Sequence, residues 1–143
     1  MATINPYLNF NGTTEEAFNF YKSVFGGEFI TLLRFKDAPE TDKIPASDQE
    51  KIMHVSLPIG KGNVLMATDA LESCGHSLTP GNNFYISINA ENEEVADRLF
   101  NGLSAGGLVT MALHKAFWGA YFGMFTDKFG IQWMVSYDYN QQK

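Results

Sequence analysis

The sequence contains little cysteine, no concentrated positive charge and no long apolar run. Its only cysteine is Cys74, so no disulfide can form within the chain, and a reducing compartment is expected. The ten lysines and arginines are scattered singly and the net charge is −6, which argues against nucleic acid as a partner. No apolar run approaches the roughly 20 residues that a membrane-spanning helix needs, and the first ten residues lack the features of a signal peptide. We therefore expect a cytoplasmic protein that binds neither nucleic acid nor a membrane.

The chain is long enough for one compact domain and too short for two ordinary ones. It has 143 residues, of which 45% are hydrophobic. A chain of this length can bury one sizeable core. We therefore expect a single domain over residues 1–143, built as one unit or from two half-size units that share a core.

The aromatic-rich stretch 117–137 predicts a β-hairpin. Asp127 and Gly130 lie between two apolar segments, and they supply a side chain that caps its own backbone and a residue that accepts positive φ. The second arm alternates in the way of a strand with one buried face. One face carries Ile131, Trp133, Val135 and Tyr137, and the other carries Gln132, Met134 and Ser136.

The remaining sequence predicts strands and helices in a regular order. A strand at 3–10 precedes a helix that begins with a Thr13–Glu16 capping box and ends at a glycine pair, 26–27. Strands are expected at 28–35, 52–59 and 64–68. A strand at 84–90, a helix from the N-cap Asn92 to about residue 105, a short strand at 108–111 and the hairpin complete the chain.

Two loops interrupt this order. The first, 37–51, is polar, carries Pro39 and Pro45 and shows no periodicity. A loop of this length in a compact domain is either mobile or functional, so we regard it as a candidate lid. The second loop covers residues 69–82.

The two halves of the chain repeat one order of elements. Each half reads strand, helix and three strands, and each helix has a similar pattern ahead of a glycine pair. The first helix has Glu16-Ala17 and Phe20-Tyr21 before residues 26–27, and the second has Val95-Ala96 and Leu99-Phe100 before residues 106–107. We interpret this as a duplicated βαβββ module, in which neither half closes a core alone.

A paired βαβββ module resembles the vicinal oxygen chelate superfamily, which includes glyoxalase I, bleomycin resistance proteins and extradiol dioxygenases. Three segments are similar to its PhnB-like branch, which is also labelled 3-demethylubiquinone-9 3-methyltransferase-like. They are NPYLNFNGTTEEAFNFYKSVFGGEF, LMATDA and FWGAYFGMFTDKFGIQWM. The methyltransferase label finds no support in the residues, because no glycine-rich turn leads from a strand into a helix as a nucleotide-like cofactor requires.

The resemblance implies an α+β fold in which paired βαβββ modules form a curled mixed-sheet cup with helices on the convex side. Module 1 covers about residues 1–70 and module 2 about 82–143. In metal-dependent relatives four cup-facing residues hold a divalent ion, and these positions match Asn5, His54, Tyr85 and Met134. An amide, a phenol and a thioether are poor ligands for such an ion. We therefore expect no metal and no cofactor, with a divalent metal as the alternative.

Strand alternation extends the set of residues that face the cup. Neighbours two positions away share a face, and Trp118 lies at the mouth of the last hairpin, where it can stack on a ligand. The alternation does not settle which face Tyr121 occupies. The predicted ligand-binding residues are Asn5, Tyr7, Asn9, His54, Ser56, Tyr85, Ser87, Asn89, Trp118, Tyr121, Gln132, Met134 and Ser136.

Two classes of function follow from this set. The first is metal-independent binding of a small polar or aromatic molecule, since amides, hydroxyls and one imidazole can orient such a ligand. The alternative is an enzyme of the lyase, isomerase or dioxygenase type, which either holds a metal or uses His54 and Tyr85 as acid–base groups. Fold analogy cannot choose between these classes. The resemblance and the apolar strand edges also predict a homodimer.

Overall fold

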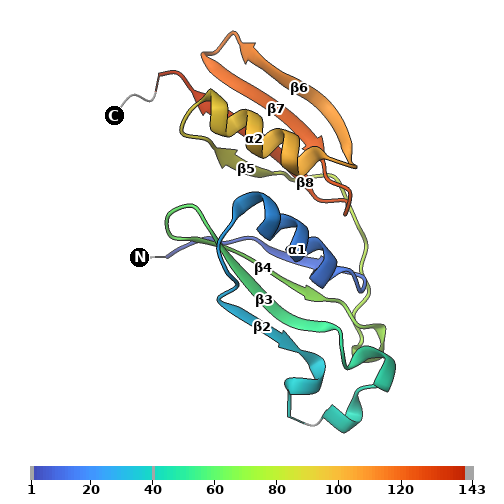
Figure 1. The fold of residues 1–143 in the computed structure, drawn as a ribbon. Coiled ribbons are helices and arrows are strands. Elements are labelled where there is room, and N and C mark those ends of the chain that lie inside the picture. Colours follow the sequence, from blue (N-terminus) through green and yellow to red (C-terminus); the bar gives the residue numbers. More distant parts are fainter. Residues whose placement is uncertain (1, 40, 141–143) are drawn as a thin grey trace. The chain divides into compact units, whose positions relative to one another are not determined.

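The structure, a computed structural model, describes residues 2–39 and 41–140. The chain divides into two compact units, Met1–Thr79 and Pro80–Lys143, which are called module 1 and module 2 below (Figure 1). Each module consists of a four-stranded mixed sheet and one long helix. None of the described helices is both long enough and apolar enough to cross a membrane.

Module 1 contains the first four strands and the first helix. Its sheet has the order β1-β4-β3-β2, in which β1 runs parallel to β4 and the other neighbours are antiparallel. The elements are β1 (Tyr7–Phe10), α1 (Thr14–Phe25), β2 (Thr31–Arg34), β3 (Ile52–Ile59) and β4 (Asn63–Asp69).

Module 2 repeats this topology. Its sheet has the order β5-β8-β7-β6, with β5 parallel to β8 and the other neighbours antiparallel. The elements are β5 (Ile86–Asn89), α2 (Glu93–Ser104), β6 (Leu108–Ala116), β7 (Ala120–Thr126) and β8 (Gln132–Asp138). The predicted α+β fold of duplicated βαβββ modules is confirmed.

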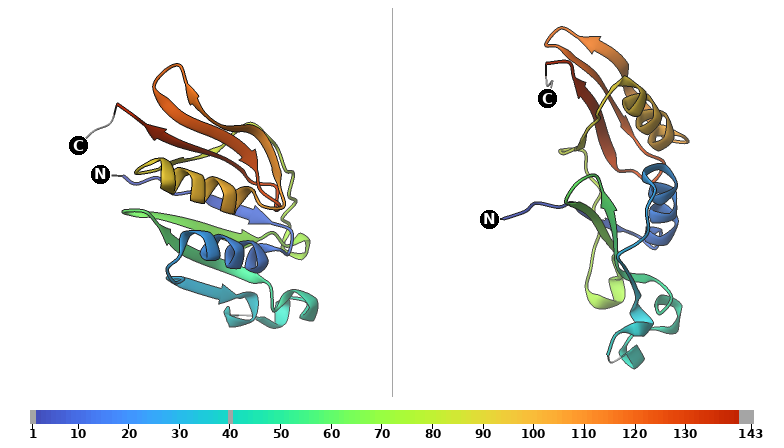
Figure 2. Two further views of the ribbon diagram at one scale, coloured as in Figure 1. Left: turned by 45° about the horizontal axis from the view of Figure 1, so that its top comes forward. Right: turned by 60° about the vertical axis from the view of Figure 1, so that its left-hand side comes forward.

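One face of each sheet is covered by the helix of its own module (Figure 2). In module 1 the ring of Phe10 meets the ring of Phe18 on α1 edge to face, with 6.5 Å between centroids. In module 2 the ring of Phe125 meets Phe100 on α2 in the same way at 5.0 Å. Burying side chains of this size stabilises a fold by about 1.5–3 kcal/mol each. The two cores therefore lie between helix and sheet.

The predicted capping box at the start of α1 is wrong. The side chain of Thr13 makes no capping hydrogen bond. Instead, Asp69 at the end of β4 accepts hydrogen bonds from the backbone N–H and the hydroxyl of Thr14, at 3.0 and 2.6 Å. A carboxylate from a neighbouring strand satisfies the free N–H and also suits the positive end of the helix dipole.

Other local predictions are confirmed. The Asn92 side chain accepts a hydrogen bond from the Val95 N–H at the start of α2. Between β7 and β8 the Asp127 carboxylate accepts hydrogen bonds from the backbone N–H groups of Phe129 and Ile131. Gly130 in this turn has φ 91°, which a residue with a side chain rarely adopts. The strand predicted at 108–111 was too short, since β6 continues to Ala116.

Candidate functional site

The face of each sheet that points away from its own helix is called the open face. In module 1 the strand registers place four side chains in one row across this face. Tyr7 pairs with Met66, Met66 with Ser56, and Ser56 with Thr31. The buried side chains Leu8 and Phe10 alternate with Tyr7 and point toward the helix instead. The prediction that Tyr7 and Ser56 share a face is therefore confirmed.

A second row on the same open face contains His54. Asn9 pairs with Thr68 and Leu33 pairs with His54. The His54 ring lies 5.8 Å from the Tyr7 ring between centroids, tilted by 38°. Tyr7 is 47% exposed and His54 is partly exposed, so this phenol and imidazole are accessible together. The open face of module 1 thus presents hydroxyl, amide and imidazole groups.

The corresponding rows of module 2 have a different character. In the first row Ser87 pairs with Met134, Met134 with Met124, and Met124 with Met111. The second row consists of Asn89, Ser136, Phe122 and His114 in the same strand order. Predicted residues Ser87, Asn89, Met134 and Ser136 are brought together on this face. It is rich in thioethers and aromatic rings.

Trp118 lies in the turn between β6 and β7. It is 54% exposed, and its ring stands 5.5 Å from that of Phe122, with an interplanar angle of 66°. The neighbouring Phe117 is almost fully exposed and contacts Trp118 edge to face. Since Phe122 belongs to the second row, Trp118 borders the open face of module 2.

Tyr121 lies on the helix face of the sheet. Alternation in the sequence had left its face undecided. It pairs with Tyr137 of β8, and its hydroxyl donates a 2.6 Å hydrogen bond to Asp97 on α2. This hydrogen bond, with burial and the negative charge of Asp97, raises the pKa of Tyr121 to about 12. Tyr121 therefore links helix to sheet and does not belong to the open face.

Asn5, Tyr85 and Gln132 lie where strands begin. Asn5 comes before β1, and its side-chain oxygen accepts a hydrogen bond from the Val64 N–H at 3.0 Å. The Gln132 side chain donates to the carbonyl oxygen of Phe84 at 2.6 Å. Tyr85 comes just before β5 and is 36% exposed. Two of these side chains are thus engaged in holding the first strand of a module to the last one.

The four positions matched to a metal site do not fit a divalent ion. The Asn5 side-chain oxygen is committed to the Val64 backbone, and Tyr85 and Met134 offer a phenol and a thioether. Ions such as zinc and manganese prefer imidazoles and carboxylates. Across residues 2–39 and 41–140, no three His, Cys, Asp or Glu side chains are grouped so that they could hold a metal ion.

The registers also reveal residues that the sequence did not identify. Met66 on β4 is the counterpart of Met134 on β8, because each lies beside the first strand of its module. Met111, Met124, Phe122 and His114 also lie on the open face of module 2. The signal for Met66 was present in the alternation of β4. The face of Met124 and Phe122 required the register of β7 with β8, and that of Met111 and His114 required the true length and bulges of β6.

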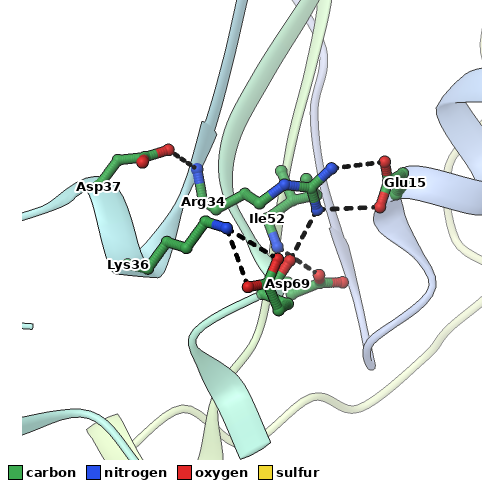
Figure 3. Close-up of polar contacts among 7 residues, drawn as sticks. Glu15, Arg34, Lys36, Asp37, Ile52 and Asp69 are labelled. Carbon is green, nitrogen blue, oxygen red and sulfur yellow. Dashed lines mark hydrogen bonds and ion pairs between the residues drawn. The ribbon is translucent and has the colours of Figure 1, made fainter. Parts of the chain in front are cut away.

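The loop proposed as a lid is tied to the sheet of module 1. The segment between β2 and β3, which includes this loop, contains three short 3₁₀ turns at Phe35–Asp37, Thr41–Lys43 and Ala46–Asp48. The Arg34 guanidinium donates to both carboxylate oxygens of Glu15 on α1, at 2.9 and 2.7 Å, and to the backbone oxygen of Glu50 at 2.7 Å (Figure 3). Lys36 pairs with the Glu50 carboxylate at 2.9 Å. Both ends of the loop are therefore anchored next to the start of β3.

Comparison with known proteins places the chain among relatives of similar length. The profile of the family described as 3-demethylubiquinone-9 3-methyltransferase matches residues 2–136. Protein YjdN of Escherichia coli is 30% identical over 141 residues, which is 93% of each chain.

Solved structures agree with this placement. The protein PA1353 from Pseudomonas aeruginosa is 42% identical, with a TM-score of 0.85 over 96% of this chain and 98% of that one. A protein from Bacillus cereus described as a putative 3-demethylubiquinone-9 3-methyltransferase, PhnB protein, is 26% identical, with a TM-score of 0.75 over 95% and 99%. Glyoxalase/bleomycin resistance proteins share the fold at 15–18% identity and TM-scores of 0.59–0.62. The chain belongs to the 3-demethylubiquinone-9 3-methyltransferase family, is similar to a PhnB protein of that family, and has the fold of the glyoxalase/bleomycin resistance proteins.

Proposed function

We propose that the open faces of the sheets bind a small polar or aromatic molecule, and that no divalent metal takes part. The observation that carries this proposal is the repeated arrangement of the two sheets. In each module a buried apolar face meets the helix, and the opposite face carries a row with polar side chains at matching positions. Ligand sites typically combine apolar and aromatic side chains with a few polar groups that orient the ligand.

The open face of module 1 supports hydrogen bonding to the ligand. His54 and Tyr7 lie next to each other, and a neutral imidazole and a phenol each offer one donor and one acceptor. The partly exposed hydroxyl of Thr31 continues the row beyond Ser56, which is itself buried. A ligand with carbonyl, hydroxyl or amide groups would find several partners there.

The open face of module 2 supports contact with an aromatic ring. Trp118 and Phe122 stand edge to face, and Trp118 keeps half of its surface exposed. An aromatic ligand that stacks on such a ring gains about 0.5–1.5 kcal/mol beyond the area that it buries. Met124 and Met134 beside Phe122 are flexible and can adapt to the outline of a ring.

A thermal-shift screen of small polar and aromatic compounds tests the binding proposal. A ligand present at 100 times its Kd stabilises the folded state by about 2.7 kcal/mol. The shift should shrink in His54→Ala or in Trp118→Ala, according to the module that the compound contacts. Tyr121→Phe is the matched control, since it changes an aromatic residue on the helix face. Equal shifts in all three variants would place binding elsewhere.

Elemental analysis tests metal independence. Protein expressed without a histidine tag, in medium supplemented with nickel, zinc, manganese and iron, should contain far less than one divalent ion per chain. Near-stoichiometric metal that is lost in His54→Ala would show an oxygen-chelating centre and overturn this part of the proposal.

We also propose that the protein is a homodimer that pairs through β6. This strand is the edge of its sheet, and Leu108 and Val109 on it are 65% and 45% exposed. An exposed apolar edge strand favours pairing with another chain, and twofold pairing is the commonest result. Light scattering should give twice the chain mass for the wild type and a single chain mass for Val109→Lys. A monomeric wild type, or a dimer unchanged in the variant, would contradict this interface.

A further inference from the structure

Three methionines form a continuous row on the open face of module 2. Met111, Met124 and Met134 come from the neighbouring strands β6, β7 and β8, and the registers pair Met111 with Met124 and Met124 with Met134. Residues paired directly across neighbouring strands point to the same side of a sheet. The three residues are called the methionine row below. They account for half of the six methionines of the chain.

The spacing allows the three sulfur atoms of the methionine row to approach one point. Neighbouring strands lie about 4.8 Å apart, so Met111 and Met134 each start one strand away from the central Met124. A methionine side chain has three rotatable bonds and can lean across such a gap. Met111 is 38% exposed, and the other two are partly exposed. The row is therefore open to an ion from solution.

Two irregularities in β6 bring a histidine to the same face. Met111 and His114 are three positions apart, which would put them on opposite faces of a regular strand. The register shifts between Val109 and Met111 and again between Met111 and His114, so that Met111 lies opposite Met124 and His114 opposite Phe122. The ring contact between His114 and Phe122, at 6.4 Å, agrees with this placement. Bulges that redirect a side chain are common beside functional sites.

The His114 ring is held in the tautomer that a metal ligand needs. Its Nδ1 lies 3.0 Å from the backbone oxygen of Ala112. A carbonyl oxygen can only accept, so Nδ1 carries the hydrogen, and in the neutral ring Nε2 keeps its lone pair. Metal-bound histidines typically donate their second N–H to a carbonyl or a carboxylate in this way.

We propose that module 2 contains a binding site for a soft monovalent cation of the Cu(I) class. The thioethers of the methionine row are its ligands, and His114 Nε2 completes the set. Thioether sulfur selects Cu(I) and binds hard divalent ions poorly. The corresponding row of module 1 carries Tyr7, Met66, Ser56 and Thr31, so it has one thioether and cannot form such a site. This site shares Met124 and Met134 with the surface proposed for an aromatic ligand, but its formation requires neither an organic molecule nor a divalent metal.

Silver(I) is the probe for a first test, because it has the same coordination preferences and needs no reductant. Cys74 is an exposed free thiol that would capture the ion, so every protein carries Cys74→Ser and no histidine tag. With ¹³C-methyl methionine labelling, one equivalent of Ag(I) in chloride-free buffer should move the methyl signals of Met111, Met124 and Met134. The signals of Met53 and Met66 should stay in place.

Leucine variants of the methionine row separate coordination from packing. Met→Leu conserves volume and apolar character, so the melting temperature should change little. In competition with a chelator, each of Met111→Leu, Met124→Leu, Met134→Leu and His114→Gln should weaken Ag(I) binding about tenfold or more. Met66→Leu is the matched control and should leave the affinity unchanged.

Three outcomes would overturn the proposal. The first is the absence of Ag(I) binding in the Cys74→Ser protein. The second is unchanged affinity in the triple leucine variant of the methionine row. The third is a movement of the Met66 signal as large as those of the methionine row. Because no organic compound is present in these experiments, none of the three bears on the binding function proposed above.

Discussion

The two modules share one backbone plan but present different chemistry on their open faces. At matching positions of the first row, module 1 has hydroxyls where module 2 has thioethers. Module 1 carries Tyr7, Met66, Ser56 and Thr31, and module 2 carries Ser87, Met134, Met124 and Met111. The backbone registers thus set where side chains stand, while the residues decide what each face can bind.

The helix faces differ as well. Each module has one buried aspartate, Asp69 or Asp127. Asp69 joins three segments, since it binds Thr14 on α1 and also accepts from the Ile52 N–H at 2.8 Å. Asp127 closes the turn between β7 and β8 and accepts from the indole N–H of Trp133 at 2.8 Å. Module 1 therefore uses a carboxylate to join distant elements, and module 2 uses one locally.

Replacing these aspartates should cause the largest loss in the free energy of unfolding. Asp69→Ala leaves two backbone donors and a hydroxyl without their acceptor, and hydrogen bonds to a charged group contribute about 1.5–3 kcal/mol each. We expect a loss of about 3–5 kcal/mol in urea unfolding, with faster amide exchange throughout module 1. Asp127→Ala also removes the acceptor of three hydrogen bonds, but the two from the backbone are only partly buried and lie within one turn, so it should cost less and affect exchange mainly in β7 and β8. An equal or greater loss for Asp127→Ala would contradict the difference between the modules.

Gly123 offers a second way to compare the modules. Its position in β7 of module 2 matches that of Val55 in β3 of module 1. Gly123 pairs with Val135 on β8, and Val55 pairs with the equivalent residue Ala67 on β4. A Cβ on Gly123 would lie 2.7 Å from the Phe100 ring and 3.0 Å from the Met111 carbonyl oxygen. Gly123→Ala should therefore cost about 1–3 kcal/mol.

A double-mutant cycle identifies the cause of that cost. Phe100→Leu removes the ring edge, so the penalty for Gly123→Ala should be smaller in the Phe100→Leu background. An unchanged penalty would assign the clash to the backbone of β6.

The contacts of Arg34 with Glu15 and Glu50 occur in module 1 alone, and their loss should have a smaller effect on stability. Arg34→Ala removes the bonds to Glu15 and Glu50, and a partly exposed cluster of this kind contributes about 1 kcal/mol or less. The Arg34 guanidinium, through its hydrogen bonds, lowers the pKa of the Glu15 carboxyl. The contribution of the Arg34–Glu15 pair to stability is therefore fully present above the ordinary carboxyl pKa, and it is lost as pH falls through the lowered pKa of Glu15. The difference in unfolding midpoint between wild type and Arg34→Ala should therefore narrow below about pH 4; a constant difference would contradict the assignment.

The pH-dependent effect of replacing Tyr121 on stability should be the smallest, and it should appear only at alkaline pH. The hydrogen bond to Asp97 raises the pKa of Tyr121 to about 12, above an ordinary value of about 10. A raised pKa contributes stability below pH 10 that is lost as pH rises toward 12. Tyr121→Phe should remove this alkaline loss and one late-titrating phenol from the absorbance titration. A variant with the same titration curve as the wild type would show that Tyr121 is not held by Asp97.

Sequence patterns predicted the elements whose causes are local. The turn at Asp127 and Gly130, the Asn92 cap and the repeated βαβββ order depend on neighbouring residues, and all are confirmed. Strict alternation in β1, β5 and β8 also assigned residues to the correct faces, because each of those strands has one apolar side.

Features that depend on distant contacts were not predicted. The cap of α1 comes from Asp69, 55 positions away from Thr14, and the more familiar Thr13–Glu16 pattern nearby was misleading. The face of Tyr121 was undecided because β7 is apolar on both sides. The bulges of β6 break its alternation, so Met111 and His114 could be placed together only from the register.

The central claim is that the open faces bind a small molecule, and amide chemical-shift mapping tests it most directly. ¹⁵N-labelled protein would be titrated to millimolar concentration with pools of small polar and aromatic compounds. The account predicts a compound whose shifts concentrate on open-face residues such as Tyr7, His54 and Ser56, or Ser87, Phe122 and Trp118. Shifts confined to the outer surfaces of α1 and α2, or no specific shifts with any pool, would contradict it.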